Sequence, residues 1–119
     1  MSNIKLEYLY TVQEYVTFHI YVQSGNFSGE SNFCMPKKIL TEAIVSLSNV
    51  HENLKGSYQI NDYDSDDYIL FKMLKLGHME ITGQVGGSYN DQFLRYQFEC
   101  DQTDLLCIIQ TLKEFTTRK

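Results

Sequence analysis

The segment FLRYQFECDQTDLLCIIQTLKEF, Phe93 to Phe115, passes from a strand pattern to a helix pattern within a few residues. Up to Cys100 apolar side chains alternate with polar ones, which is the two-residue period of a half-buried strand. Asp101 then offers a carboxylate that can cap the free amides of a first helical turn. The apolar residues that follow recur at helical spacing and form one stripe: Leu105, Ile108, Ile109 and Leu112. The segment therefore predicts a strand followed directly by an amphipathic helix, both packed on a core.

The rest of the chain shows six further strand patterns and one further helix pattern. Strands are expected over residues 5–10, 15–22 and 27–34, and again over 54–60, 68–74 and 78–85. Between the two groups, Pro36 fits the first turn of a helix, and the apolar stripe after it ends near Asn49. Short turns between neighbouring strands favour antiparallel pairing. We expect one α+β domain over residues 1–119, mainly antiparallel, in the order β-β-β-α-β-β-β-β-α, with the strand order left open.

Composition restricts the function classes. The chain has 119 residues, 43% hydrophobic and 21% charged, which suits one folded domain. Its net charge of −5 disfavours nucleic-acid binding, which needs cations to neutralise phosphates, and is compatible with a basic protein partner. No apolar run approaches the ~20 residues that span a bilayer. The N-terminus lacks the apolar core of a secretory signal, and three cysteines show neither disulfide-scaffold nor zinc spacing. We expect a cytoplasmic protein without a membrane partner.

No residue pattern predicts catalysis. His19 and His78 fall on the polar faces of their strands, as does Gln84, and all three are expected in solvent. Cys100 and Cys107 are expected as small core residues, so no cysteine has a catalytic context. The glycines at 83, 86 and 87 precede a strand, whereas a phosphate-binding loop opens a helix. We predict no enzyme activity, no cofactor and no nucleotide site.

The acidic cluster DYDSDD at residues 62–67 admits three interpretations. Its alternating aspartates resemble the start of an EF-hand loop, but Asp67 stands where that loop needs glycine and Met73 where it needs a bidentate glutamate. The other two interpretations are a solvated hairpin loop and an acidic contact patch with aromatic neighbours. We predict no metal site. The candidate partner-binding residues are Asp62, Tyr63, Asp64, Asp66, Asp67, Tyr68 and Tyr89.

Three segments carry a resemblance to a known family. They are LKGSY at 54–58, GHMEITG at 77–83, and YQFECDQTDL at 96–105, whose Asp101-Gln102-Thr103 corner is the most telling. From the first helix onward, the chain resembles the WapI-like immunity proteins of bacterial polymorphic toxin systems. The resemblance implies a non-enzymatic cytoplasmic protein that binds and neutralises a cognate toxin domain by stoichiometric occlusion. In the namesake system that toxin domain is a tRNA-cleaving nuclease.

A different class of function stays open beside it. A non-catalytic structural domain could assemble with copies of itself through an exposed strand edge. The identity of the toxin, the surface that binds it and the oligomeric state do not follow from the sequence.

Overall fold

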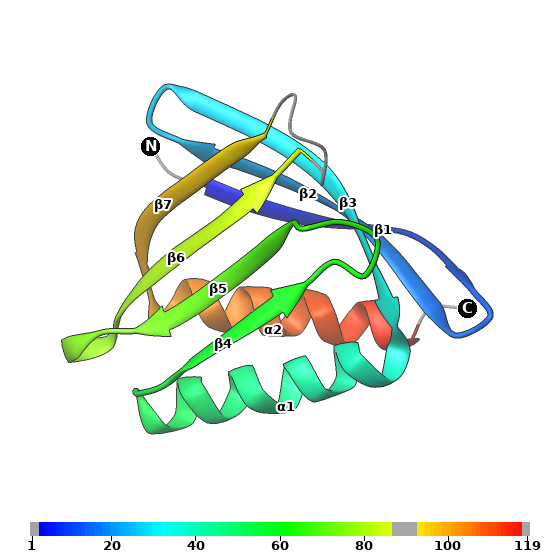
Figure 1. Cartoon of the computed structure of the whole chain (residues 1–119). Helices are drawn as coiled ribbons and strands as arrows, with labels where there is room; N and C mark the ends of the chain where they lie inside the picture. The colour runs from blue at the N-terminus through cyan, green and yellow to red at the C-terminus, as the bar shows by residue number, and fades with distance from the viewer. Residues whose placement is uncertain (1–2, 87–92, 118–119) are drawn as a thin grey trace.

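The computed structural model describes residues 3–86 and 93–117. Within these ranges seven strands and two long helices follow the predicted order (Figure 1). The elements are β1 (Asn3–Val12), β2 (Tyr15–Ser24), β3 (Phe27–Pro36), α1 (Lys37–Asn53), β4 (Ser57–Asn61), β5 (Tyr68–Met73), β6 (His78–Val85), β7 (Leu94–Asp101) and α2 (Gln102–Thr117). The α+β prediction is confirmed.

The strands form two antiparallel sheets, and in each sheet neighbours in sequence are neighbours in space. One sheet has the order β1-β2-β3 and the other β4-β5-β6-β7. The β1–β2 turn consists of Gln13 and Glu14, whose φ angles are 50° and 70°. Two consecutive left-handed residues are typical of the two-residue hairpin turn whose twist matches that of the strands. Such short connections explain why the strands pair as simple meanders.

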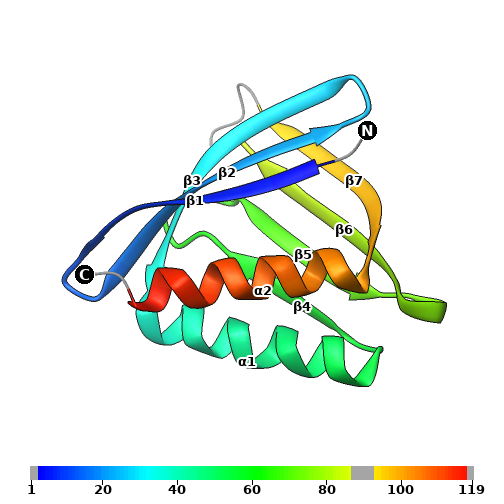
Figure 2. The ribbon, with the colours of Figure 1, turned by 180° about the vertical axis from the view of Figure 1, so that it is seen from behind.

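The core lies between the two sheets and the two helices. The sheets touch directly where β2 meets β7 and β3 meets β6, and each helix contacts both sheets. The helices lie side by side along one side of the molecule (Figures 1 and 2). The inward face of β2 is fully buried and shows the strand period predicted for it: Val16, Phe18, Ile20 and Val22. Burying each such side chain stabilises the fold by about 1.5–3 kcal/mol.

The first helix differs from its prediction at both ends. Pro36 is the residue before the first helical turn, with φ −59° and ψ 142°, and the helix starts at Lys37. The helix continues past Asn49 to Asn53, because Val50 extends the buried stripe by one more turn. Leu54 then ends it in the left-handed conformation, with φ 54°.

The second helix has the predicted cap. Asp101 Oδ1 accepts hydrogen bonds from the backbone N–H groups of Thr103 and Asp104, at 2.9 and 3.1 Å. In return Asp104 Oδ2 accepts one from the N–H of Asp101 at 3.1 Å. This reciprocal pair satisfies three donors at the corner where β7 becomes α2. Gln102 packs beside the β5–β6 connection, since a Cβ on Gly77 would lie 3.3 Å from its side chain.

Four expected side-chain positions are wrong or only partly right. His19 is half-buried rather than in solvent. Gln84 is 6% exposed rather than in solvent, because its amide bonds Asp67 on one side and Arg95 on the other. Cys107 is exposed, since it lies beside the apolar stripe of α2 rather than on it, and Cys100 is half-buried. His78 is exposed as predicted.

Candidate partner-binding surface

The loop between β4 and β5 contains the acidic cluster, and its first aspartate is structural. Asp62 is 7% exposed. Its Oδ1 accepts the backbone N–H of Cys34 at 2.9 Å, and its Oδ2 accepts the hydroxyl of Ser65 at 2.6 Å. The next residue of the loop, Tyr63, donates its N–H to the Cys34 carbonyl at 3.0 Å. The loop is thereby attached to the outer edge of β3.

The last aspartate of the cluster is also structural. Asp67 is 1% exposed. Its Oδ2 accepts the hydroxyl of Ser31 in β3 at 2.6 Å, and its Oδ1 accepts the side-chain amide of Gln84 in β6 at 3.3 Å. One carboxylate thus joins a strand of each sheet. Asp62 and Asp67 are therefore not available as exposed contacts for a partner.

The remaining predicted residues divide by exposure. Tyr63, Asp64 and Asp66 are exposed, the tyrosine by 52% of its surface. Tyr68 is half-buried at the start of β5. Tyr89 lies outside the described residues. The exposed part of the loop is therefore its tip, one aromatic ring with two carboxylates, held in place by the two buried aspartates.

The structure adds residues from the β1–β2 hairpin to this tip. A hollow of about 500 Å³ lies on the outer face of the three-stranded sheet, lined by Tyr10, Val12, Tyr15, Thr17, Asn32, Cys34 and Asp64. Tyr10, Val12 and Tyr15 are exposed. We call this set, with Tyr63 and Asp66 from the loop tip, the acidic tyrosine surface. The hairpin residues were not singled out in sequence, although Tyr15 on the polar face of its strand was a signal that could have found them.

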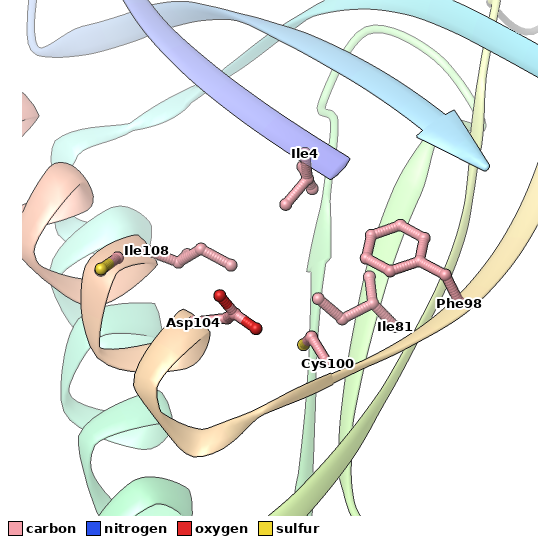
Figure 3. Close-up of a pocket in the computed structure, with 7 residues that line it drawn as sticks. Ile4, Ile81, Phe98, Cys100, Asp104 and Ile108 are labelled. Atoms are coloured by element: carbon pink, nitrogen blue, oxygen red, sulfur yellow. The ribbon is translucent and has the colours of Figure 1, made fainter. Parts of the chain in front are cut away.

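A second hollow lies between β1, the four-stranded sheet and α2, and Figure 3 shows its lining. Its volume is about 250 Å³, and its walls combine apolar side chains with two thiols and one carboxylate: Ile4, Ile81, Phe98, Ile108, Cys100, Cys107 and Asp104. Burial, reinforced by the nearby Asp104 and Asp101 carboxylates, raises the pKa of the Cys100 thiol to about 12. That thiol is protonated at neutral pH, whereas the nucleophilic form of cysteine is the thiolate.

Asp104 in the same hollow is already engaged in the helix cap. Among residues 3–86 and 93–117, no group of three or more His, Cys, Asp or Glu side chains could hold a metal ion. Within the described chain, no helix is both long and apolar enough to cross a membrane.

Comparison with known proteins decides the family. The model of the immunity protein WapI-like family matches residues 6–118. The chain belongs to this family. The match includes the N-terminal meander, so it extends further than the resemblance noted from the first helix onward. Neither a curated protein nor a solved structure matches the chain.

Family membership gives the acidic tyrosine surface a context. The partners of immunity proteins are toxin proteins. The kind of functional site that fits this family is therefore a protein-binding surface, and exposed aromatic and charged side chains are suited to one. The Asp101-Gln102-Thr103 corner, which carried the resemblance, is a helix cap and a packing contact. The observed contacts of this corner are therefore structural.

Proposed function

We propose that this immunity protein acts in the cytoplasm by binding the toxin domain of a cognate toxin, a nuclease in the leading case, and occluding it stoichiometrically. The protein performs no chemistry of its own in this proposal. The family match over residues 6–118 is the observation that carries it. The acidic tyrosine surface is the proposed contact.

The charge of the chain supports a cationic partner. A net charge of −5 attracts a basic protein, and complementary charge mainly raises the association rate. A nuclease must bind phosphates and so tends to present cations at its substrate site. Asp64 and Asp66 are the exposed carboxylates of the loop tip, and Tyr63 and Tyr15 are exposed rings of the kind enriched at interface cores. We expect the cationic surface of the toxin to cover these residues.

Co-expression with the C-terminal domain of the protein encoded immediately upstream tests the proposal. We expect the chain to rescue growth and to co-elute with that domain as a stable one-to-one complex. Full toxicity with no complex would remove that domain as the partner.

A pair of charge variants tests the surface. Asp64→Asn with Asp66→Asn should slow association and weaken its salt dependence, with little effect on dissociation. Glu52→Gln with Glu114→Gln removes the same charge from exposed helix positions and is the matched control. Equal association rates for the two double variants would take the loop tip out of the interface.

The second candidate is assembly with copies of the same chain through β1. This ten-residue strand pairs with β2 along one edge, and no other strand of the described residues pairs with its other edge. A free edge of that length can add a further strand. Self-association that rises with concentration, in a protein that binds no toxin, would favour this candidate.

A further inference from the structure

The outer edge of β1 has a regular segment that ends at a bulge. Residues 3–8 pair with β2 in unbroken register, and the register shifts between Tyr8 and Tyr10. A bulge twists the edge of a sheet and interrupts regular pairing with a further strand. No other strand of the described residues pairs with this edge of β1. The segment that can add a strand is therefore residues 3–8.

Two exposed side chains of opposite charge lie on this segment. Lys5 and Glu7 are two positions apart in the strand, so both point to the outer face of the three-stranded sheet. Within the described part of the chain the one side-chain ion pair joins His19 and Glu30. The edge therefore presents one cation and one anion that have no ion-pair partner among these residues.

A second copy of the same edge can pair with both charges. Two identical strands pair antiparallel about a two-fold axis, and side chains of one face meet when their residue numbers differ by an even amount. With Leu6 on the axis, Lys5 lies opposite Glu7 of the partner subunit, and Glu7 lies opposite the partner subunit's Lys5. The two neighbouring registers place Lys5 opposite the partner's Lys5 or Glu7 opposite the partner's Glu7. Opposite charges across a sheet are stabilising and like charges destabilising, so charge selects the register centred on Leu6.

The inner face of the same register is apolar. Ile4, Leu6 and Tyr8 are half-buried and pack against the core. The register puts Leu6 opposite Leu6 of the partner subunit and Ile4 opposite the partner subunit's Tyr8, and such apolar cross-strand pairs stabilise a sheet. All of these pairs fall within residues 3–8, so the paired segment ends where the regular edge ends.

The space beside this edge is open. β1 is the strand of its sheet that lies nearest α2 (Figure 2). A hollow of about 370 Å³ lies between the two elements, lined by Ile4, Lys5, Leu6, Glu7, Cys107, Ile108 and Thr111. An added strand has room here, and it would withdraw the half-buried Ile4 and Leu6 further from water, which favours association.

We infer that the protein forms a two-fold dimer through residues 3–8 of β1, with Lys5 opposite Glu7 of the partner subunit. The inference extends the second candidate function by naming the segment, the register and the charges that select it. It does not depend on toxin binding. Tyr10 and Val12, the β1 residues of the acidic tyrosine surface, lie beyond the bulge, so the dimer leaves that surface open. A toxin complex of the dimer would contain two copies of each protein.

Charge reversal at the two positions tests the register. Sedimentation velocity over a series of concentrations gives the dimer dissociation constant of the full chain. Lys5→Glu places two carboxylates opposite each other at both pairs, and Glu7→Lys places two ammonium groups there. Each variant alone should therefore raise the dissociation constant at least about tenfold. An equimolar mixture of the two variants should form a mixed dimer as tight as the wild type, because each pair then joins one carboxylate and one ammonium group.

Control variants separate the pairing from folding and from net charge. Lys5→Glu combined with Glu7→Lys exchanges the two charges and should dimerise like the wild type. Lys38→Glu and Glu52→Lys, at exposed positions of α1, change the net charge by the same amounts as the single reversals. Both should leave the dimer dissociation constant unchanged.

The outcomes for the dimer and for the toxin are distinguishable. A wild type that stays monomeric at every concentration would overturn the inference, and so would a dimer that both single reversals leave intact. A mixture that associates no more tightly than either variant alone would also overturn it. Toxin binding by a monomeric protein would leave the proposed function standing. A dimer that follows the charge reversals but binds no toxin domain would support the inference without the proposed function.

Discussion

Ser31 in β3 donates a 2.6 Å hydrogen bond to the carboxylate of Asp67, which closes the acidic loop before β5. Because Asp67 also accepts from Gln84 in β6, one side chain connects the three-stranded sheet to the four-stranded sheet. The same bonds hold the loop tip, with Tyr63 and Asp64, beside the β1–β2 hairpin. The candidate binding surface therefore depends on a buried polar contact between sheets.

Removal of that carboxylate should destabilise the protein. Asp67→Ala removes the acceptor of the buried Gln84 side-chain amide and the short 2.6 Å acceptor of the half-buried Ser31 hydroxyl, and we expect a loss of about 2 kcal/mol in the free energy of unfolding. Urea denaturation followed by circular dichroism measures it. Asp66→Ala, at the exposed neighbouring position, is the control and should change stability by no more than about 0.5 kcal/mol. Equal losses for the two variants would mean that the Asp67 contacts are weak in solution.

Removal of the Tyr96 hydroxyl should not destabilise the protein. This hydroxyl is buried and has no hydrogen-bond partner within the described residues. An unpaired buried hydroxyl is unfavourable, so Tyr96→Phe should leave the free energy of unfolding unchanged or raise it by about 1 kcal/mol. Chemical denaturation of the wild type and of Tyr96→Phe measures whether the free energy of unfolding rises, stays the same or falls. A loss of more than about 1 kcal/mol would show that the hydroxyl is hydrogen-bonded in solution.

Gly83 is needed because two groups approach its backbone closely. A Cβ at this position would lie 2.4 Å from the carbonyl oxygen of Tyr68 and equally close to the hydroxyl of Tyr96. The carbonyl belongs to the paired strand β5 and cannot move away without breaking the ladder. We expect Gly83→Ala to cost at least about 2 kcal/mol in thermal or urea unfolding.

The control for Gly83 is a glycine in open space. Gly25 has a φ of +62° and no atom within 4 Å of an added Cβ, so Gly25→Ala meets backbone strain alone, about 1 kcal/mol. If Gly83→Ala and Gly25→Ala lower the free energy of unfolding equally, the close approach of Tyr68 and Tyr96 does not require glycine at position 83.

Stability should decline at alkaline pH partly through Cys100. The thiol has an ordinary pKa of 9.0 and a pKa of about 12 in the folded protein. Between these values the folded chain holds a proton that the unfolded chain has lost, so the free energy of unfolding falls as pH rises through this window. Burial also raises the pKa of Tyr96, which adds to the decline above pH 10.

Urea unfolding from neutral pH to about pH 11 measures this decline. Cys100→Ala should make it shallower, because only the Tyr96 contribution and smaller ones remain. Cys107→Ala, at an exposed thiol, is the control and should leave the slope unchanged. Parallel curves for the wild type and Cys100→Ala would contradict the raised pKa of this half-buried thiol.

The local patterns were sufficient for the elements and their order. Three patterns predicted the last strand and helix: the alternation in Leu94–Asp101, the aspartate cap and the apolar stripe that ends at Leu112. Each pattern involves only residues close in sequence, so each predicts its element without reference to the rest of the fold. The end of α1 was misplaced by four residues because Leu54, rather than a glycine, takes the left-handed terminus. Propensity favours glycine there, so no local signal marks the position.

The candidate surfaces depended on contacts between residues far apart in sequence. Asp62 and Asp67 look like their neighbours in the DYDSDD cluster. In the fold their carboxylates are buried and accept hydrogen bonds from Cys34 and Ser31 of β3, so of the four aspartates only Asp64 and Asp66 are exposed. Alternation specifies which face of a strand is apolar, whereas the position of a loop against a distant strand is decided by hydrogen bonds and packing that form only in the folded chain.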